Sequence, residues 1–436
     1  MIFSHGLGGS RNSYSYVAGS LASHGMVVVC PEHRDGSAVA SPMRQAARNG
    51  DHSKGQGARI LIPYQKYSHT PCQETYAGRS SQLKIRLWEL GLAHSAVLAL
   101  NDGRSFTNLD TTTPNLNSFA ETLRVREPGS IIFGGHSYGS TTTVHFLKST
   151  FHAGSPKLAQ MRNPLFVPKE GSQIRKQITE NTPTMLLDLW CMPFLIPDTL
   201  PLVDLPLPAY ADTPSAPGGK AILAVESEAF VKWNEHLHLT ALAISPNPAA
   251  KVVTTGMFER KSGTSFPQPN LFYVINSAHL NQSDFGILFP WLTKRMFQAV
   301  EPERVLRLNL RAQLQFLRQN GVPVAQTCSA DMVDGPEKST AGMQSDGSDD
   351  DSAILDKRDG LVGHWKAIST IGLGAAREAD TGKSVGEQVE EGEQHMKGEI
   401  EPSEKMSAMT EGRSNVTDMN DSKNFVKQDR SEIVVS

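Results

Sequence analysis

The sequence predicts an open, mostly parallel α/β sheet of about six strands flanked by helices. Two observations support this fold class. Short apolar runs of strand character alternate with longer segments in which apolar residues recur every three or four positions. In mid-chain, one strand-like run ends at a glycine-rich turn and passes directly into a helix-like segment. Sheets of this kind carry their functional loops at the carboxyl ends of the strands.

The mid-chain turn reads Phe-Gly-Gly-His-Ser-Tyr-Gly and holds Ser137 between Gly135 and Gly139. This spacing is typical of a sharp strand–turn–helix elbow that raises a nucleophilic serine above a parallel sheet. Glycine is expected at both flanking positions because a side chain at either one would collide with the opposite arm of the turn. A second match, centred on Ser384, follows a polar segment without strand character. We therefore expect the elbow at Ser137 and not at Ser384.

The other elements follow the same alternation. Strands are expected at residues 1–3, 26–30, 131–133, 184–190, 220–225 and 270–275. Helices are expected at residues 13–23, 80–100, 138–149, 226–243, 285–300 and 303–320. Residues 36–78 and 193–219 are expected to form loops, and residues 150–182 an excursion over the sheet. Because the chain opens inside a strand, we expect that it is truncated or that its sheet lacks the first strands.

The composition changes beyond residue 322. Residues 345–351 and 387–404 are charged and contain few large apolar side chains. Such segments cannot bury enough apolar surface to offset the entropy of the chain. We therefore expect a catalytic domain at residues 1–322 and a disordered polar and acidic tail at residues 323–436. Within this tail, the apolar residues 361–365 are expected to remain partly solvated.

The bulk properties exclude several functions. The 436 residues carry a net charge of −3, so no basic excess indicates a nucleic-acid partner. No apolar run is long enough for a transmembrane helix, and no signal peptide is visible. The four cysteines are scattered, which favours reduced thiols in a cytoplasmic protein over a disulfide framework. The sequence offers no indication of protein partners.

A serine nucleophile needs a base and an acid, which follow it on this kind of sheet in the order acid, then histidine. Of the histidines after Ser137, His279 alone directly follows a predicted strand, so we assign it as the base. Asp188 lies near the end of a predicted strand and is barely favoured as the acid over Glu226 and Glu228, which follow the next strand. Asp284 is expected in the first turn of the following helix.

Two backbone amides are expected to bind the oxyanion. Tyr138, the residue after the proposed nucleophile, supplies one N–H group. Leu7, in the glycine-rich loop after the first strand, is expected to supply the other. No cluster of histidine and acidic residues has the spacing of metal ligands, and we expect neither a metal nor another cofactor.

Six blocks of residues resemble the platelet-activating factor acetylhydrolases, which have the α/β-hydrolase fold. They are Phe3-Ser4-His5-Gly6-Leu7-Gly8, Ser23-His24-Gly25, Glu32-His33-Arg34-Asp35, Gly135-His136-Ser137-Tyr138-Gly139, Leu187-Asp188-Leu189-Trp190 and Ser277-Ala278-His279. The resemblance covers about residues 1–320. It departs from the family in lacking a substantial N-terminal stretch and in a long gap between Ser137 and Asp188, which implies an inserted segment.

The resemblance implies a calcium-independent phospholipase A2 that removes acetyl and other short sn-2 acyl groups. It assigns the nucleophile to Ser137, the base to His279 and the oxyanion donors to Leu7 and Tyr138, and it raises Asp188 well above Glu226 as the acid. The implied partner is a phospholipid, held at a membrane surface. Two alternatives stay open: a non-catalytic interaction module built on the same fold, and an esterase for soluble short-chain esters.

Overall fold

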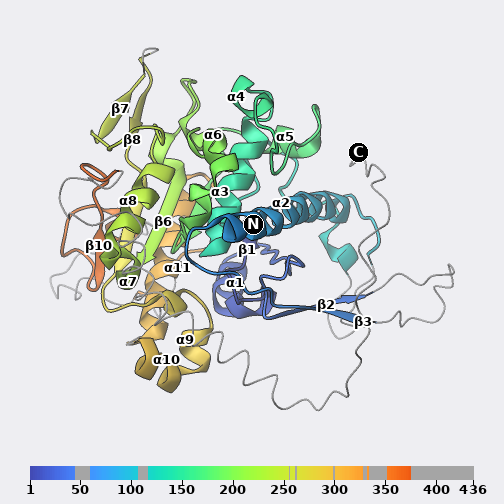
Figure 1. Cartoon of the computed structure of the whole chain (residues 1–436). Coiled ribbons are helices and arrows are strands. Elements are labelled where there is room, and N and C mark those ends of the chain that lie inside the picture. Colours follow the sequence, from blue (N-terminus) through green and yellow to red (C-terminus); the bar gives the residue numbers. More distant parts are fainter. Residues whose placement is uncertain are drawn as a thin grey trace.

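The computed structural model describes residues 1–44, 59–106, 116–254, 256–260, 263–297, 300–327, 331–332 and 351–374. Its centre is a six-stranded sheet in the order β1-β4-β5-β6-β9-β10 (Figure 1). The strands are β1 (Ile2–Ser4), β4 (Phe133–His136), β5 (Thr184–Leu187), β6 (Ile222–Ser227), β9 (Asn270–Val274) and β10 (Trp365–Ala367). Neighbouring strands from β1 to β9 are parallel, and β10 is antiparallel to β9. This confirms the predicted α/β sheet and agrees with the α/β-hydrolase fold.

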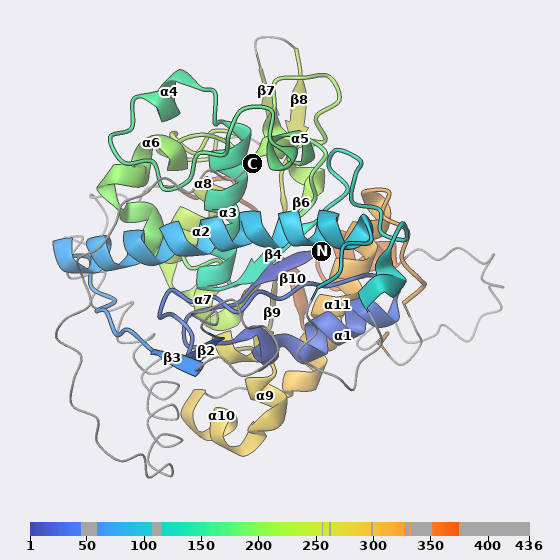
Figure 2. The same ribbon diagram turned by 90° about the vertical axis from the view of Figure 1, so that its right-hand side faces the viewer.

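Helices cover both faces of the sheet (Figures 1 and 2). They are α1 (Ser15–Ser23), α2 (Gln73–Asn101), α3 (Tyr138–Phe151), α4 (Pro156–Ala159), α5 (Gln173–Gln177), α6 (Leu200–Val203), α7 (Glu228–Lys232), α8 (Asn234–Ala243), α9 (Phe285–Leu288), α10 (Pro290–Phe297) and α11 (Pro302–Gln319). The helix expected at residues 226–243 is divided at Trp233, and the one expected from residue 285 is divided at Phe289. No helix in the described ranges is both long enough and apolar enough to cross a lipid bilayer.

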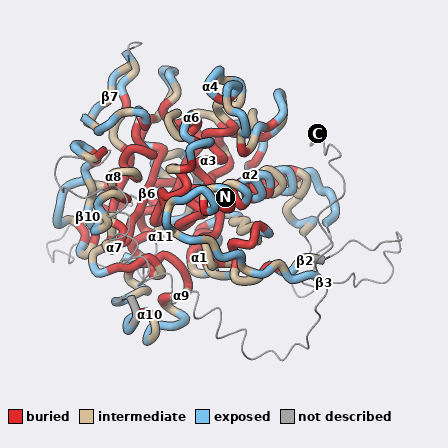
Figure 3. The backbone as a smooth tube through the Cα atoms, in the orientation of Figure 1, coloured by how far each residue is buried: buried red, intermediate tan, exposed pale blue. Residues whose placement is uncertain are grey.

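The strands are buried from both sides, which explains their continuous apolar character. Side chains alternate between the faces of a strand. On β5, Met185 and Leu187 pack into the layer formed with α1 and α11, whereas Leu186 packs into the opposite layer with α2 and α3. Figure 3 shows the resulting buried interior along β6, α3 and α11. Five strands of the sheet therefore carry two apolar cores, one on each face.

Two antiparallel hairpins lie outside the main sheet. One pairs β2 (Ala40–Arg44) with β3 (Arg59–Pro63), and the other pairs β7 (Met257–Glu259) with β8 (Ser265–Pro267). The first hairpin lies where the sequence predicts only loop. A proline within β2 and the Ser, Gly and Pro residues around both strands hide their extended character in the sequence.

The strand expected at residues 26–30 is reduced to a single bridge. Val29 pairs in parallel with Ile2, and its carbonyl accepts the amide of Phe3 at 2.9 Å. Met26 and Val28 lie half-buried at this edge of the sheet without forming further ladder pairs. The sheet reaches six strands through β10 instead.

The expectation of a disordered tail from residue 323 is wrong for residues 351–374. Ile354, Val362 and Trp365 are buried against the domain. The Trp365 ring stacks on Phe272 of β9 at 5.2 Å, and its indole N–H donates to the Ile354 carbonyl at 2.7 Å. Asp351 forms a buried, two-pronged ion pair with Arg311 of α11 at 2.7 and 2.8 Å. The charged surroundings of this short apolar segment mask it in the average composition. Residues 345–350 and 375–436, with Ser384, lie outside the described residues.

The docked segment also supports the polypeptide beyond β9. The Ile275 amide, just past β9, donates to the His364 carbonyl at 2.8 Å. A chain ending at Thr327 should therefore unfold at a Tm lower by more than about 5 °C, because several buried apolar side chains lose their partners. A chain ending at Gly374 is the matched control and should keep the Tm of the whole chain. Equal thermal unfolding of the two shortened chains would show that the segment contributes no stability.

Candidate active site

The turn between β4 and α3 is strained at Ser137. This residue has φ 56° and ψ −121°, which side-chain-bearing residues rarely adopt. A Cβ atom on Gly135 would lie 2.4 Å from the Gly139 carbonyl carbon, as expected for opposite arms of a tight turn. A Cβ atom on Gly139 would lie 1.9 Å from the carbonyl oxygen of Ser4, at the end of β1. The second glycine is thus required by the neighbouring strand rather than by the turn itself.

The end of β5 holds this elbow in place. The Ser137 amide donates to the Leu187 carbonyl at 2.9 Å. The Ser140 hydroxyl lies between the carbonyls of Gly135 and Leu187, at 2.7 and 3.0 Å. Ser137 is buried but lines a narrow cavity of about 30 Å³. The structure therefore places Ser137 at the carboxyl edge of the sheet, in the wall of a small cavity.

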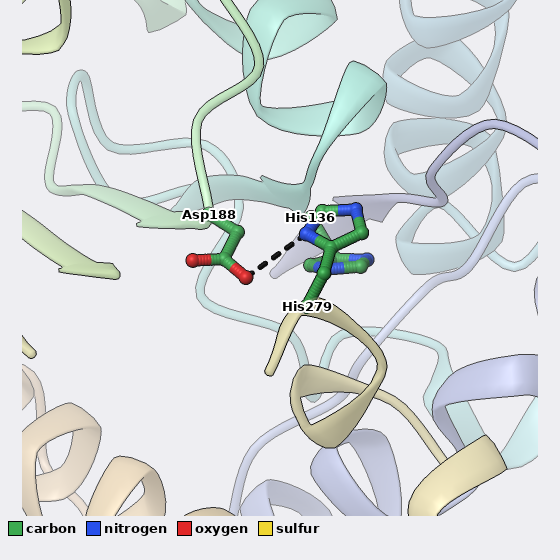
Figure 4. Close-up of side chains that lie close together, drawn as sticks. All are labelled: His136, Asp188 and His279. Carbon is green, nitrogen blue, oxygen red and sulfur yellow. Dashed lines mark hydrogen bonds and ion pairs between the residues drawn. The ribbon is translucent and has the colours of Figure 1, made fainter. Parts of the chain in front are cut away.

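Asp188 and His279 meet beside this cavity. The His279 Nδ1 atom lies 2.9 Å from Asp188 Oδ2 (Figure 4). Asp188 follows β5, and His279 follows β9 on a short loop. An ionised carboxylate can only accept, so Nδ1 carries the proton and Nε2 is left as the acceptor. His279 lines the same cavity as Ser137. Ser137, His279 and Asp188 thus form a candidate serine–histidine–aspartate set beside one cavity.

The His279 ring is clamped on both faces. It stacks on Phe230 with ring centroids 4.5 Å apart and planes 2° from parallel. His136 lies against the other face at 4.4 Å. Burial, and after it the proximity of His279, holds the pKa of His136 well below its usual value, so this ring is neutral. The imidazole of His279 is therefore held in orientation by two uncharged rings.

The structure brings neither Glu228 nor Asp284 to the imidazole. Glu228 accepts the Asn276 amide at 2.7 Å and pairs with Lys232. Asp284 accepts two amides at the start of α1, from Ser15 at 2.6 Å and Tyr16 at 3.0 Å. The sequence predicts Asp284 in the first turn of the following helix. Asp284 lies at the N-cap of that helix, α9, but its side chain caps α1 and makes no cap bond to α9. Glu226 is buried, and its Oε1 atom accepts the Leu189 amide at 3.4 Å.

The loop after β1 packs directly on the elbow. Leu7 lines the cavity, and a Cβ atom on Gly6 would lie 3.0 Å from the Cβ atom of Ser137. The Gly6 carbonyl accepts from His5 Nδ1 at 2.8 Å, because the His33 amide donates to the other nitrogen of His5. In a trans peptide the next N–H points away from the carbonyl. The Leu7 amide is consequently directed away from His5.

A buried ion pair between α2 and Asp35 anchors the loop after β1. Arg86 of α2 donates to the His5 carbonyl at 2.8 Å and pairs with Asp35 at 2.8 Å. Burial raises the pKa of Asp35, but the charge of Arg86, together with His33 and two hydrogen bonds from Ser37, lowers it to about 2. Arg86 was not among the residues predicted from the sequence. Its position among Leu83, Leu87 and Leu90 on one helical face was the available signal, because a charge on a buried face needs a partner.

Tyr14 is a second residue near the site that was not predicted from the sequence. Its hydroxyl accepts the Gly6 amide at 2.9 Å and lies 2.8 Å from His136 Nδ1, so it joins the loop to the elbow. Tyr14→Phe should slow the reaction of Ser137 with a fluorophosphonate probe about tenfold, since it leaves two buried polar groups without partners. Tyr16→Phe, on the adjoining helix, is the control and should react at the wild-type rate. Equal labelling rates for the two variants would show that the Tyr14 hydroxyl does not support the reactivity of Ser137.

One group of side chains in the described part of the chain has the residue types of a metal site. Ligand atoms of His136, Asp188 and His279 lie within 4.8 Å of one another. Nδ1 of His279 is already bonded to Asp188, and Nδ1 of His136 lies 2.8 Å from the Tyr14 hydroxyl. The two imidazole rings are tilted by 32°, with centroids 4.4 Å apart. The arrangement therefore fits hydrogen bonding better than metal coordination.

Known proteins share these features. The family model described as platelet-activating factor acetylhydrolase, isoform II, matches residues 1–181. A protein of Schizosaccharomyces pombe, provisionally named a phospholipase A2, is 27% identical over 337 residues, which are 74% of this chain and 68% of that protein. Platelet-activating factor acetylhydrolases of Bos taurus and Cavia porcellus are 32% and 33% identical over 151 and 147 residues.

The mammalian matches cover 34% of this chain, and the chain spans about a third of the length of those relatives, 31% in each. The family match includes the loop with Leu7 and the elbow with Ser137. Asp188 and His279 lie beyond it. The comparisons confirm that this chain resembles the platelet-activating factor acetylhydrolases.

Proposed function

We propose that this chain is a serine-dependent ester hydrolase that removes short, acetyl-like sn-2 acyl groups from phospholipids. The observation that carries the proposal is the Asp188–His279 hydrogen bond of 2.9 Å beside a cavity that also exposes the strained elbow serine, Ser137. The names of the similar proteins support phospholipids as the class of substrate.

In this mechanism the Ser137 hydroxyl attacks the sn-2 carbonyl carbon while His279 Nε2 takes the hydroxyl proton. Asp188 stabilises the imidazolium that forms. The amides of Leu7 and Tyr138 donate to the oxyanion. The imidazolium then protonates the leaving oxygen, which releases the lyso-phospholipid and leaves an acyl-enzyme. Water, deprotonated by His279, hydrolyses the acyl-enzyme by the same route.

The size of the cavity supports a short acyl group. The cavity of about 30 Å³ beside Ser137 is narrow, which favours a short acyl group over a long one. Leu7 and Trp190 form part of the wall, and the base forms another part.

A patch beside the cavity supports action at a lipid surface. Leu288, Phe289 and Trp291 are 63%, 45% and 70% exposed, at the junction of α9 and α10. Phe285, at the start of α9, lines the cavity. Arg295 lies over the Trp291 ring at 5.5 Å. Exposed apolar side chains next to a cation suit the boundary of a bilayer, where the rings enter and the charge meets headgroups. Figure 1 shows both helices projecting together from the domain.

The proposal includes a cytoplasmic location. Cys30, Cys72 and Cys191 carry free thiols, whereas Cys328 lies outside the described residues. Free thiols are the usual state in the reducing cytosol. Recovery of the protein in the cytosolic fraction of lysed cells would support this location, and recovery in a secreted fraction would oppose it.

Ser137→Ala should abolish both ester hydrolysis and labelling by a fluorophosphonate probe, because it removes the proposed nucleophile. Ser384→Ala, at the other match to the elbow spacing, should change neither. Labelling is read by fluorescence after gel separation. Failure of the wild-type protein to react would favour a non-catalytic module, and labelling of the Ser137→Ala protein at the wild-type level would remove the assignment.

Acetyl, butanoyl and palmitoyl sn-2 phosphatidylcholines, compared in vesicles with and without a calcium chelator, test the substrate class. The acetyl lipid should be cleaved fastest, and chelation should have no effect because amides rather than a metal bind the oxyanion. Preference for palmitoyl would refute the short-chain assignment. Equal rates on a soluble acetyl ester would favour the esterase alternative, and loss of activity on chelation would overturn the metal-free mechanism.

A further inference from the structure

Two buried carboxyl groups lie side by side behind the proposed base. Leu187 of β5 and Val225 of β6 are register partners, and each is followed by an acidic residue, Asp188 and Glu226. The Ser227 amide, next after Glu226, donates to Asp188 Oδ1. The Leu189 amide, next after Asp188, lies 3.4 Å from Glu226 Oε1. Each carboxyl group is therefore bonded to the residue that follows the other.

The surroundings do not compensate two negative charges. Asp188 is 0% exposed and Glu226 is 1% exposed. The titratable groups that face the pair are His279 from the loop after β9, His236 from α8, Cys191 beyond β5 and His136 at the elbow. Burial, followed by the proximity of His279, lowers the pKa of His236 to about 3. Burial likewise makes His136 neutral and raises the pKa of the Cys191 thiol.

Hydrogen bonding decides which carboxyl group keeps its charge. Both oxygens of Asp188 accept N–H groups, one from His279 and one from Ser227. Glu226 has the single long bond to Leu189, and its Oε2 atom has no N–H or O–H donor among the described residues. Charge is stabilised where the donors are. Burial raises the pKa of Glu226 well above its usual value, and the adjacent Asp188 charge raises it further.

We propose that Glu226 is a protonated carboxylic acid that donates its proton to the Asp188 carboxylate. It is then a positioning residue that holds the charged partner of His279 from behind. A neutral acid cannot stabilise an imidazolium, which explains why Asp188 rather than Glu226 serves the base. The protonation of Glu226 follows from the structure alone, whereas its effect on turnover rests on the proposed function.

Infrared spectroscopy of the whole chain at neutral pH tests the protonation directly. The wild-type protein should show the C=O stretching band of a buried protonated carboxyl group, shifted slightly in D₂O. Glu226→Gln should remove this band. Glu228→Gln, two residues further on and partly exposed, should leave it in place. Absence of the band from the wild-type spectrum, or its persistence in Glu226→Gln, would overturn the proposal.

The pH dependence of unfolding tests the protonation of Glu226 independently of the infrared spectrum. A carboxyl group whose pKa is higher in the fold than in the unfolded chain favours the fold at low pH, and this contribution is lost as pH rises towards the folded pKa. The Tm of Glu226→Gln minus that of the wild type should therefore increase between pH 5 and pH 8. A difference that stays constant or falls with pH would contradict a protonated Glu226.

Turnover separates the positioning role from simple packing. The amide of Glu226→Gln can still donate to Asp188, so its kcat should stay within a few-fold of wild type. Glu226→Leu lacks a donor and should lose about tenfold or more in kcat with little change in KM. Equal kcat for the two variants would remove the positioning role. If the wild-type protein fails to label at Ser137, the proposed function fails, and the infrared band still decides the protonation of Glu226.

Discussion

The close approach of three backbone segments at Ser137 is the constraint on which the candidate site depends. The carbonyl of Ser4 ends β1 against Gly139, and the carbonyl of Leu187 ends β5 against the Ser137 amide. These contacts force the serine into a positive φ and at the same time bring the Leu7 loop and Asp188 to it. A side chain at Gly139 would push the end of β1 and the loop after it away from the elbow. The same packing contacts therefore determine both the backbone conformation of Ser137 and the positions of the Leu7 loop and Asp188.

The sequence predicted those parts of the site that depend on local pattern. Ser137 and His279 each follow a strand whose apolar run is visible in the chain. The choice between Asp188 and Glu226 was barely made on the residues alone, because it depends on the strand order. β6 lies between β5 and β9, so the histidine loop reaches across β6 to Asp188. The spacing of residues along the chain does not show that the loop crosses β6. The preference for Asp188 over Glu226 therefore came mainly from the resemblance to a family and not from the spacing.

Both errors in the sheet concern its edges. An interior strand is apolar on both faces and stands out, whereas an edge strand is short and lies among polar residues. Residues 26–30 are apolar but form one bridge, and Trp365–Ala367 form a strand within a charged segment. The strand character of β10 is supplied by contacts that are distant in sequence, such as the stacking of Trp365 on Phe272. Such contacts leave no periodic pattern.

The buried polar groups around the site are stabilised in two different ways, by ion pairing or by loss of charge. Next to the loop that contains Leu7, Arg86 and Asp35 form a buried ion pair. Around His279, the other titratable groups are held neutral by burial, including His136 and His236. Asp188 differs from these groups because both of its carboxyl oxygens accept N–H groups, one from His279 and one from Ser227. In the proposed mechanism, an imidazolium formed during acyl transfer would have the Asp188 carboxylate at hydrogen-bond distance, which favours proton transfer from Ser137.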